Sequence, residues 1–115
     1  MSKKKYKVMV SDTVIVPVEG NLKDEHGNTV AFKFKLTCDR LSADDLKTKM
    51  SSQSSIKDIL REIVKGWEGQ RLVLEEDDTP APFCPDSFDQ LIDIAGLALL
   101  CFNTFVKENG AVEKN

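Results

Sequence analysis

The sequence contains one histidine, His26, which is the only candidate for an imidazole base. Acyl transfer by a serine or cysteine nucleophile needs such a base, held in a fixed position beside the nucleophile. His26 precedes Gly27 in a polar stretch between two apolar segments, and no serine occurs in a G-x-S-x-G motif. We therefore interpret His26 as a turn residue and predict no catalytic residue of this class.

The residue types that bind zinc are too few and too far apart to form a site. Zinc takes three or four Cys, His or carboxylate ligands, usually in closely spaced pairs. Cys38, Cys84 and Cys101 are widely separated and form no C-x-x-C pair. Because their number is odd and the sequence has no secretory context, we predict reduced thiols rather than a disulfide framework.

Two further patterns resemble ligand-binding motifs but lack essential residues. The acidic run at residues 75–78 has neither the alternating oxygen ligands nor the glycine of a calcium loop, so we interpret it as a solvated loop. The sequence GWEG at residues 66–69 is not followed by the Lys and Ser/Thr of a phosphate-binding loop, and a helix end explains it better. We predict no metal, no cofactor and no enzymatic activity.

The length and charge of the chain limit its organisation and its partners. A chain of 115 residues fits one domain, which we expect at residues 13–109, between a basic and partly disordered tail at 1–12 and a short tail at 110–115. The net charge of -3 argues against binding to a nucleic acid backbone. The longest apolar run, residues 91–102, is too short to cross a bilayer, so we expect no membrane association.

Residues 13–37 have the alternation of a small antiparallel sheet or β-hairpin. Apolar residues recur at every second position in residues 14–18 and again in residues 30–36. The polar residues 20–28 between these runs predict an open loop. Pro17 has no N–H to donate, so we expect either that its strand lies at an edge of the sheet or that the Pro17 amide points outward.

After residue 41 the period changes to that of helices, and the chain is predicted to be α+β. Three to four helices are expected, at about residues 42–50, 55–67, 86–95 and 97–109. Ser42 and Asp45 have the spacing of a start signal for the first helix, and Asp86 and Asp89 that of a capping pair for the third. Gly96 is predicted to divide the last two helices.

Apolar side chains surround the last predicted helix instead of forming one stripe. We infer that part of it contacts another subunit or a partner, although burial within the monomer would also explain the pattern. Trp67 is expected to close the core with its indole N–H on a loop carbonyl, and the alternative is an exposed anchor for a partner. The candidate partner-binding residues are Leu97, Leu100, Phe102, Phe105 and Trp67.

Three segments resemble the small tail assembly chaperones of long-tailed bacteriophages. They are ILREIVKGWEG at residues 59–69, PFCPDSF at 82–88 and LID at 91–93, separated by an acidic loop. The chain departs from many of these proteins at residues 94–96, where IAG replaces an aromatic residue followed by proline.

The resemblance implies an assembly factor encoded by a phage or prophage. Such a protein acts in the host bacterial cytoplasm, binds the tape measure protein, keeps it soluble, helps to recruit tail tube subunits and is absent from the mature virion. It also implies a homo-oligomer, and a longer form made by frameshifting in many members. Two alternatives are a structural virion protein, such as a tail terminator or head-tail connector, and an enzyme or small-ligand binder that uses residues 20–28.

Overall fold

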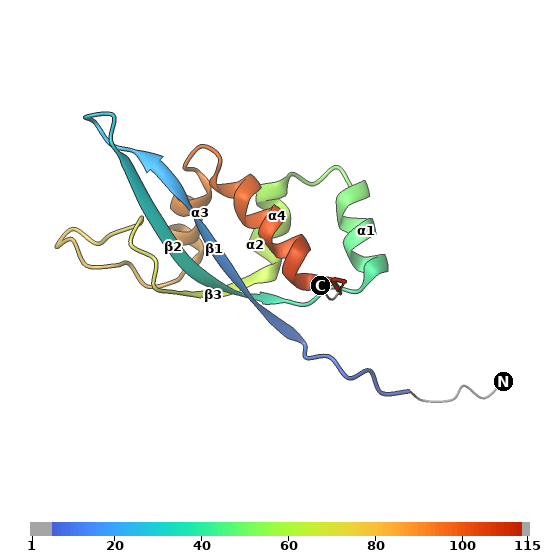
Figure 1. The fold of residues 1–115 in the computed structure, drawn as a ribbon. Helices are drawn as coiled ribbons and strands as arrows, with labels where there is room; N and C mark the ends of the chain where they lie inside the picture. The colour runs from blue at the N-terminus through green and yellow to red at the C-terminus, as the bar shows by residue number, and fades with distance from the viewer. Residues whose placement is uncertain (1–5, 114–115) are drawn as a thin grey trace.

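The computed structural model describes residues 6–113 and has an α+β fold, as the sequence predicted. A long β-hairpin comes first, two helices and a third strand follow, and two further helices end the chain (Figure 1). Residues 1–5 of the predicted basic tail and residues 114–115 of the predicted C-terminal tail lie outside the described residues. Residues 6–12 form no strand.

The hairpin consists of β1 (Thr13–Lys23) and β2 (Thr29–Asp39), which pair along their whole length. The prediction of a loop at residues 20–28 is wrong at its start, because residues 20–23 continue β1. The pairing of Leu22 with Val30 carries the ladder past the polar residues. The turn closes at residues 24–28, where Asp24 Oδ1 accepts hydrogen bonds from the N–H groups of His26 and Asn28. His26 is thus an exposed turn residue, as predicted.

The sheet has the order β1-β2-β3, so β1 lies at an edge, as Pro17 predicted. The third strand, β3 (Val64–Glu68), was not predicted, and the helix expected at residues 55–67 is wrong in its second half. α2 (Ile56–Ile63) ends at Ile63, and the chain then pairs antiparallel with β2. Val64 and Trp67 continue the helical spacing of the preceding apolar residues, but they reach the core from this strand.

α1 (Ala43–Ser51) starts at the predicted cap, because Ser42 Oγ accepts a hydrogen bond from Asp45 N. No residue of α1 is buried, and the helix lies beyond the end of the other three (Figure 1). An ion pair between Lys49 and Glu62 connects it to α2.

The N-cap residue of α3 (Pro85–Ile92) is Cys84, and its capping partner is Ser87. The predicted capping pair of Asp86 and Asp89 is therefore wrong. Cys84 Sγ accepts from Ser87 N at 3.4 Å, and Ser87 Oγ accepts from Cys84 N at 2.9 Å. The helix ends three residues earlier than predicted, because the chain turns by 101° into the last helix. Gly96 allows this turn with a φ of 88°, and α4 (Leu97–Asn109) has the predicted bounds.

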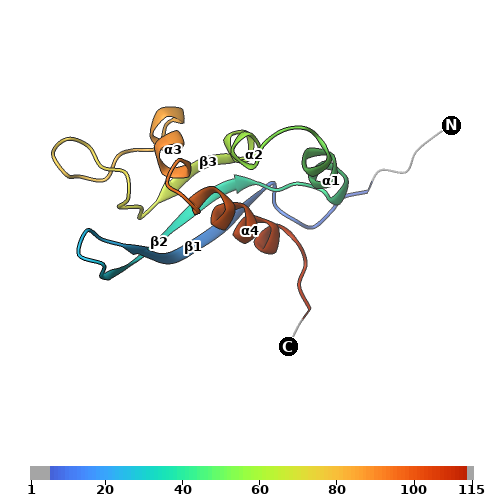
Figure 2. The same ribbon diagram turned by 90° about the horizontal axis from the view of Figure 1, so that it is seen from above.

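The molecule has two layers, with helices on one face of the sheet (Figure 2). The side chains between the layers form one core, contributed by β1, β2, β3, α2, α3 and α4: Val16, Val18, Phe34, Leu36, Cys38, Ile59, Leu60, Ile63, Val64, Phe88, Leu91, Ile92, Leu97, Cys101, Phe102 and Phe105. Within residues 6–113, no helix lies over the other face of the sheet, which carries polar residues, among them Glu19 opposite Lys33.

Candidate partner-binding surface

Three of the five candidate partner-binding residues lie in the core. Leu97, Phe102 and Phe105 are 2 %, 5 % and 0 % exposed. α4 packs against β1, α2 and α3, which together cover the side that these residues occupy. The expectation that they present surplus apolar surface is therefore corrected, because the single chain encloses all three.

Trp67 is partly buried and closes the edge of the core, as the first of its two interpretations predicted. Its indole Nε1–H donates to the carbonyl oxygen of Ala81 at 3.1 Å. Its ring makes an edge-to-face contact with Phe83, with 5.4 Å between centroids, and a tilted contact with Phe88. The indole thus holds the loop that precedes α3 and has no free polar group to offer a partner.

Leu100 is the one candidate residue on α4 that reaches an open apolar surface. It is partly buried, and its Cδ2 lies next to Gly20 of β1. From this point outward the hairpin extends beyond the helices (Figures 1 and 2). Eleven residues of strand span about 36 Å, whereas the 13 residues of α4 span about 20 Å.

The inner face of this overhanging part is apolar, and we call it the hairpin patch. Its residues are Leu22, Val30, Phe32 and Leu100, grouped around Gly20. Leu22 and Val30 pair across the strands, and Val30 is 49 % exposed. Phe32 stacks on Phe34, which belongs to the core, with 6.1 Å between ring centroids. The patch is therefore a continuation of the core that the helices leave uncovered.

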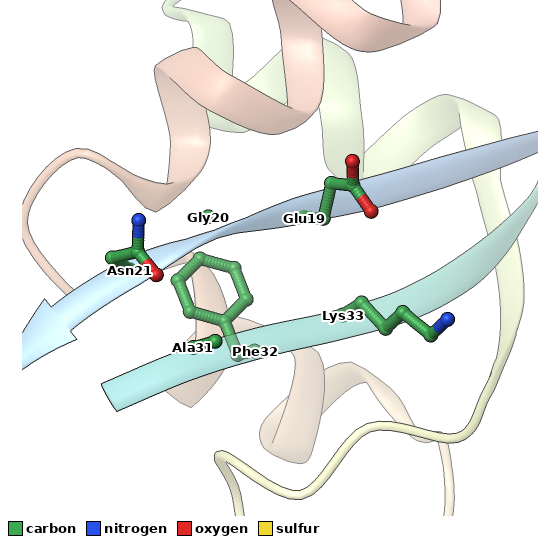
Figure 3. A pocket seen from close by; sticks show the side chains of 6 residues that line it. All are labelled: Glu19, Gly20, Asn21, Ala31, Phe32 and Lys33. Carbon is green, nitrogen blue, oxygen red and sulfur yellow. The ribbon is translucent and has the colours of Figure 1, made fainter. Parts of the chain in front are cut away.

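Gly20 gives the patch its shape. A Cβ at this position would lie 2.8 Å from Phe32 Cζ and 3.2 Å from Leu100 Cδ2, so only glycine leaves room for both side chains. The Phe32 ring consequently crosses from β2 onto β1. A shallow hollow beside the ring is lined by Glu19, Gly20, Asn21, Ala31, Phe32 and Lys33, and its charged residues, Glu19 and Lys33, belong to the opposite face of the sheet (Figure 3). The apolar surface of the hairpin patch is suited to apolar side chains of another protein.

The three cysteines lie in different environments. Burial raises the pKa of Cys38 and Cys101 to about 12, which keeps both thiols protonated. Hydrogen bonds with Ser87 lower the pKa of the exposed Cys84 thiol. Within residues 6–113, no group of three His, Cys, Asp or Glu side chains could hold a metal ion.

The hairpin patch has a signal in the sequence that the predicted strands left unused. The apolar alternation of β2 begins at Val30. The predicted first strand ended before residue 20, so it offered no residue to pair with Val30. An apolar strand residue with no partner in the predicted sheet indicates either a longer opposite strand or an uncovered surface. Here both are present.

Comparison with models of known protein families, with curated proteins and with solved structures gives no match for this chain. In the part of the chain that the structure describes, no single helix is long and apolar enough to cross a membrane. α3 and α4 meet the length and composition criteria only as a pair, with a 101° bend between them.

Proposed function

We propose that this protein is a tail assembly chaperone of a long-tailed phage or prophage, which binds the tape measure protein in the bacterial cytoplasm. It keeps this client soluble, helps to recruit tail tube subunits and leaves before the virion is complete. The observation that carries the proposal is the hairpin patch, an apolar surface continuous with the core. The resemblance of residues 59–93 to such chaperones supports it.

The chemistry of the patch suits a long helical client. A helix with an apolar stripe can lay this stripe on an apolar surface and leave its polar face in water. Four partly exposed side chains give only weak binding for one copy. Many copies along one rod would bind by avidity, because each additional contact is made at high effective concentration.

Co-expression with the tape measure protein tests this proposal with a matched pair of variants. Val30 and Ile15 are 49 % and 50 % exposed on the same hairpin, but they lie on opposite faces of the sheet. Val30→Glu should reduce both the soluble yield of the client and the amount that co-purifies. Ile15→Glu should leave both unchanged.

Two outcomes would overturn the proposal. One is an unchanged client yield with wild-type protein, with no complex recovered. The other is detection of the protein by mass spectrometry in purified particles, which would favour a structural virion protein instead.

A further inference from the structure

Residues 6–10 lead away from the domain (Figure 1). Tyr6, Val8, Met9 and Val10 are 82 %, 71 %, 87 % and 57 % exposed. Arg40 fixes the start of this segment, since its Nε donates to Ser11 O and its backbone N–H donates to Asp12 O. We call residues 1–10 the arm. Its sequence adds four lysines, at positions 3, 4, 5 and 7.

The sheet has two edges, and β3 offers the better template for an added strand. Proline in an edge strand places its missing N–H on the solvent side, so Pro17 interrupts the β1 edge. α4 also lies beside this stretch of β1, where Thr104 and Lys107 share a hollow with Pro17 and Glu19. Within residues 6–113, no backbone group outside β2 bonds to residues 65–68 of β3.

Negative charge continues from the end of β3 into the following loop. Glu68 ends the strand, and residues 75–78 are all acidic and exposed. The loop holds these carboxylates outward through a bridge between Leu74 and Pro80 and a hydrogen bond from Thr79 Oγ1 to Asp77 Oδ1. In the described chain, none of these five acids forms an ion pair. The four lysines of the arm complement them in charge.

Residues 6–10 of the arm and the acidic loop lie at opposite ends of the molecule (Figures 1 and 2). An arm that points away from its own loop is placed to meet the loop of another copy. β3 runs toward the loop, so an arm whose lysines reach the loop must run antiparallel to β3. Residues 8–12 would then lie beside residues 64–68.

We propose that the arm of one copy adds as an antiparallel strand to β3 of a second copy, with its lysines on the acidic loop of that copy. The contact joins two different surfaces, so it repeats from copy to copy and builds a ring or an open chain of subunits, according to the rotation between neighbouring copies. It concerns only contacts of the protein with itself and stands independently of the proposed function. In either assembly the hairpin patches would recur at regular intervals.

Sedimentation of the full-length protein over a range of concentrations, in 50 mM and 500 mM salt, tests the charged contact. In low salt the average mass should rise with concentration to several times that of one chain, and high salt should reduce it. A first variant replaces the four arm lysines with glutamate (Lys3→Glu, Lys4→Glu, Lys5→Glu and Lys7→Glu) and should be a monomer. A second variant replaces the four acidic residues 75–78 with lysine and should also be a monomer. Mixing these two charge-reversed proteins should restore association. The control Glu25→Lys/Lys47→Glu, at exposed sites elsewhere, should behave as wild type.

Two further measurements test whether the arm forms a strand and whether it binds another copy instead of its own chain. Val10→Pro leaves the charges unchanged but removes an N–H from the arm, and it should reduce association at least tenfold. In a mixture of ¹⁴N- and ¹⁵N-labelled protein, zero-length cross-links between arm lysines and loop acids should join chains of different label.

A wild-type protein that stays monomeric at all concentrations in low salt would overturn the proposal, and so would association that survives either charge reversal. Full association of the Val10→Pro variant would show that the arm does not pair as a strand with β3. Cross-links confined to chains of one label would show that the arm folds back on its own loop.

Discussion

The phenyl ring of Phe32 on β2 lies over Gly20 on β1, so close that a Cβ on Gly20 would sit 2.8 Å from Phe32 Cζ. Gly20→Ala should therefore destabilise the protein by about 1 kcal/mol, because the ring must swing outward to make room. Gly66→Ala is the matched control, since a Cβ there meets no atom within 4 Å. Urea unfolding of both variants checks the prediction. Equal stabilities for the two would contradict it.

Phe105 is fully buried on α4, and Phe105→Ala should cost about 3–5 kcal/mol. Phe102→Asp and Phe105→Asp should both prevent folding, because both rings lie in the core and a buried carboxylate there would have no partner. Leu99→Asp, at a residue of the same helix that is 53 % exposed, is the control and should fold. Thermal melts followed by circular dichroism compare the variants. A folded Phe105→Asp protein would show that α4 is not a core helix.

Gln70 holds the loop after β3 through four hydrogen bonds from a buried side chain. Its Oε1 accepts from the N–H groups of Leu72 and Val73, and its Nε2 donates to the carbonyls of Val73 and Ala81. Gln70→Ala should cost about 1–3 kcal/mol, because the N–H groups of Leu72 and Val73 lose the side-chain oxygen that accepts their hydrogen bonds. Exposed Gln53→Ala is the control and should change stability by less than about 0.5 kcal/mol. Chemical denaturation gives both values, and a neutral Gln70→Ala would contradict this role.

The three cysteines should differ sharply in reactivity. Hydrogen bonds with Ser87 lower the pKa of Cys84, so its thiolate forms at lower pH than that of an ordinary thiol. Burial raises the pKa of Cys38 and Cys101 to about 12 and also shields them from reagents. In native protein, a thiol reagent should modify one cysteine rapidly, and Cys84→Ser should abolish this phase.

The pH dependence of the rapid Cys84 modification tests whether Ser87 lowers the pKa of this thiol. Ser87→Ala removes the hydrogen bond between the two side chains and keeps the one that the Ser87 backbone N–H donates to Cys84 Sγ. Because the side-chain hydrogen bond is the largest cause of the lowered pKa, the midpoint of the rapid phase should move to higher pH. The same midpoint in both proteins would show that the Ser87 hydroxyl does not lower the pKa of Cys84.

The sequence determined those elements whose signals lie within a few residues of one another. Ser42 caps α1 because the N–H of Asp45 is three residues away, and Gly96 ends the turn before α4 because it tolerates a positive φ. The bounds of α4 and the edge position of Pro17 also followed from local chemistry. These features depend on backbone geometry and side-chain type, which the sequence contains directly.

The tertiary structure decided how apolar residues are covered. Val64 and Trp67 fit a helical stripe equally well, and they form a strand because β2 offers an open edge for hydrogen bonding. The apolar residues around α4 fitted two interpretations, contact with a partner and burial within the monomer. The sheet and two helices cover the side of α4 that carries Leu97, Phe102 and Phe105. The uncovered surface instead lies on the hairpin, where the pairing of Leu22 with Val30 extends the strands beyond the helices. Burial depends on what packs against a residue, and in this fold those neighbours come from segments far away in the sequence.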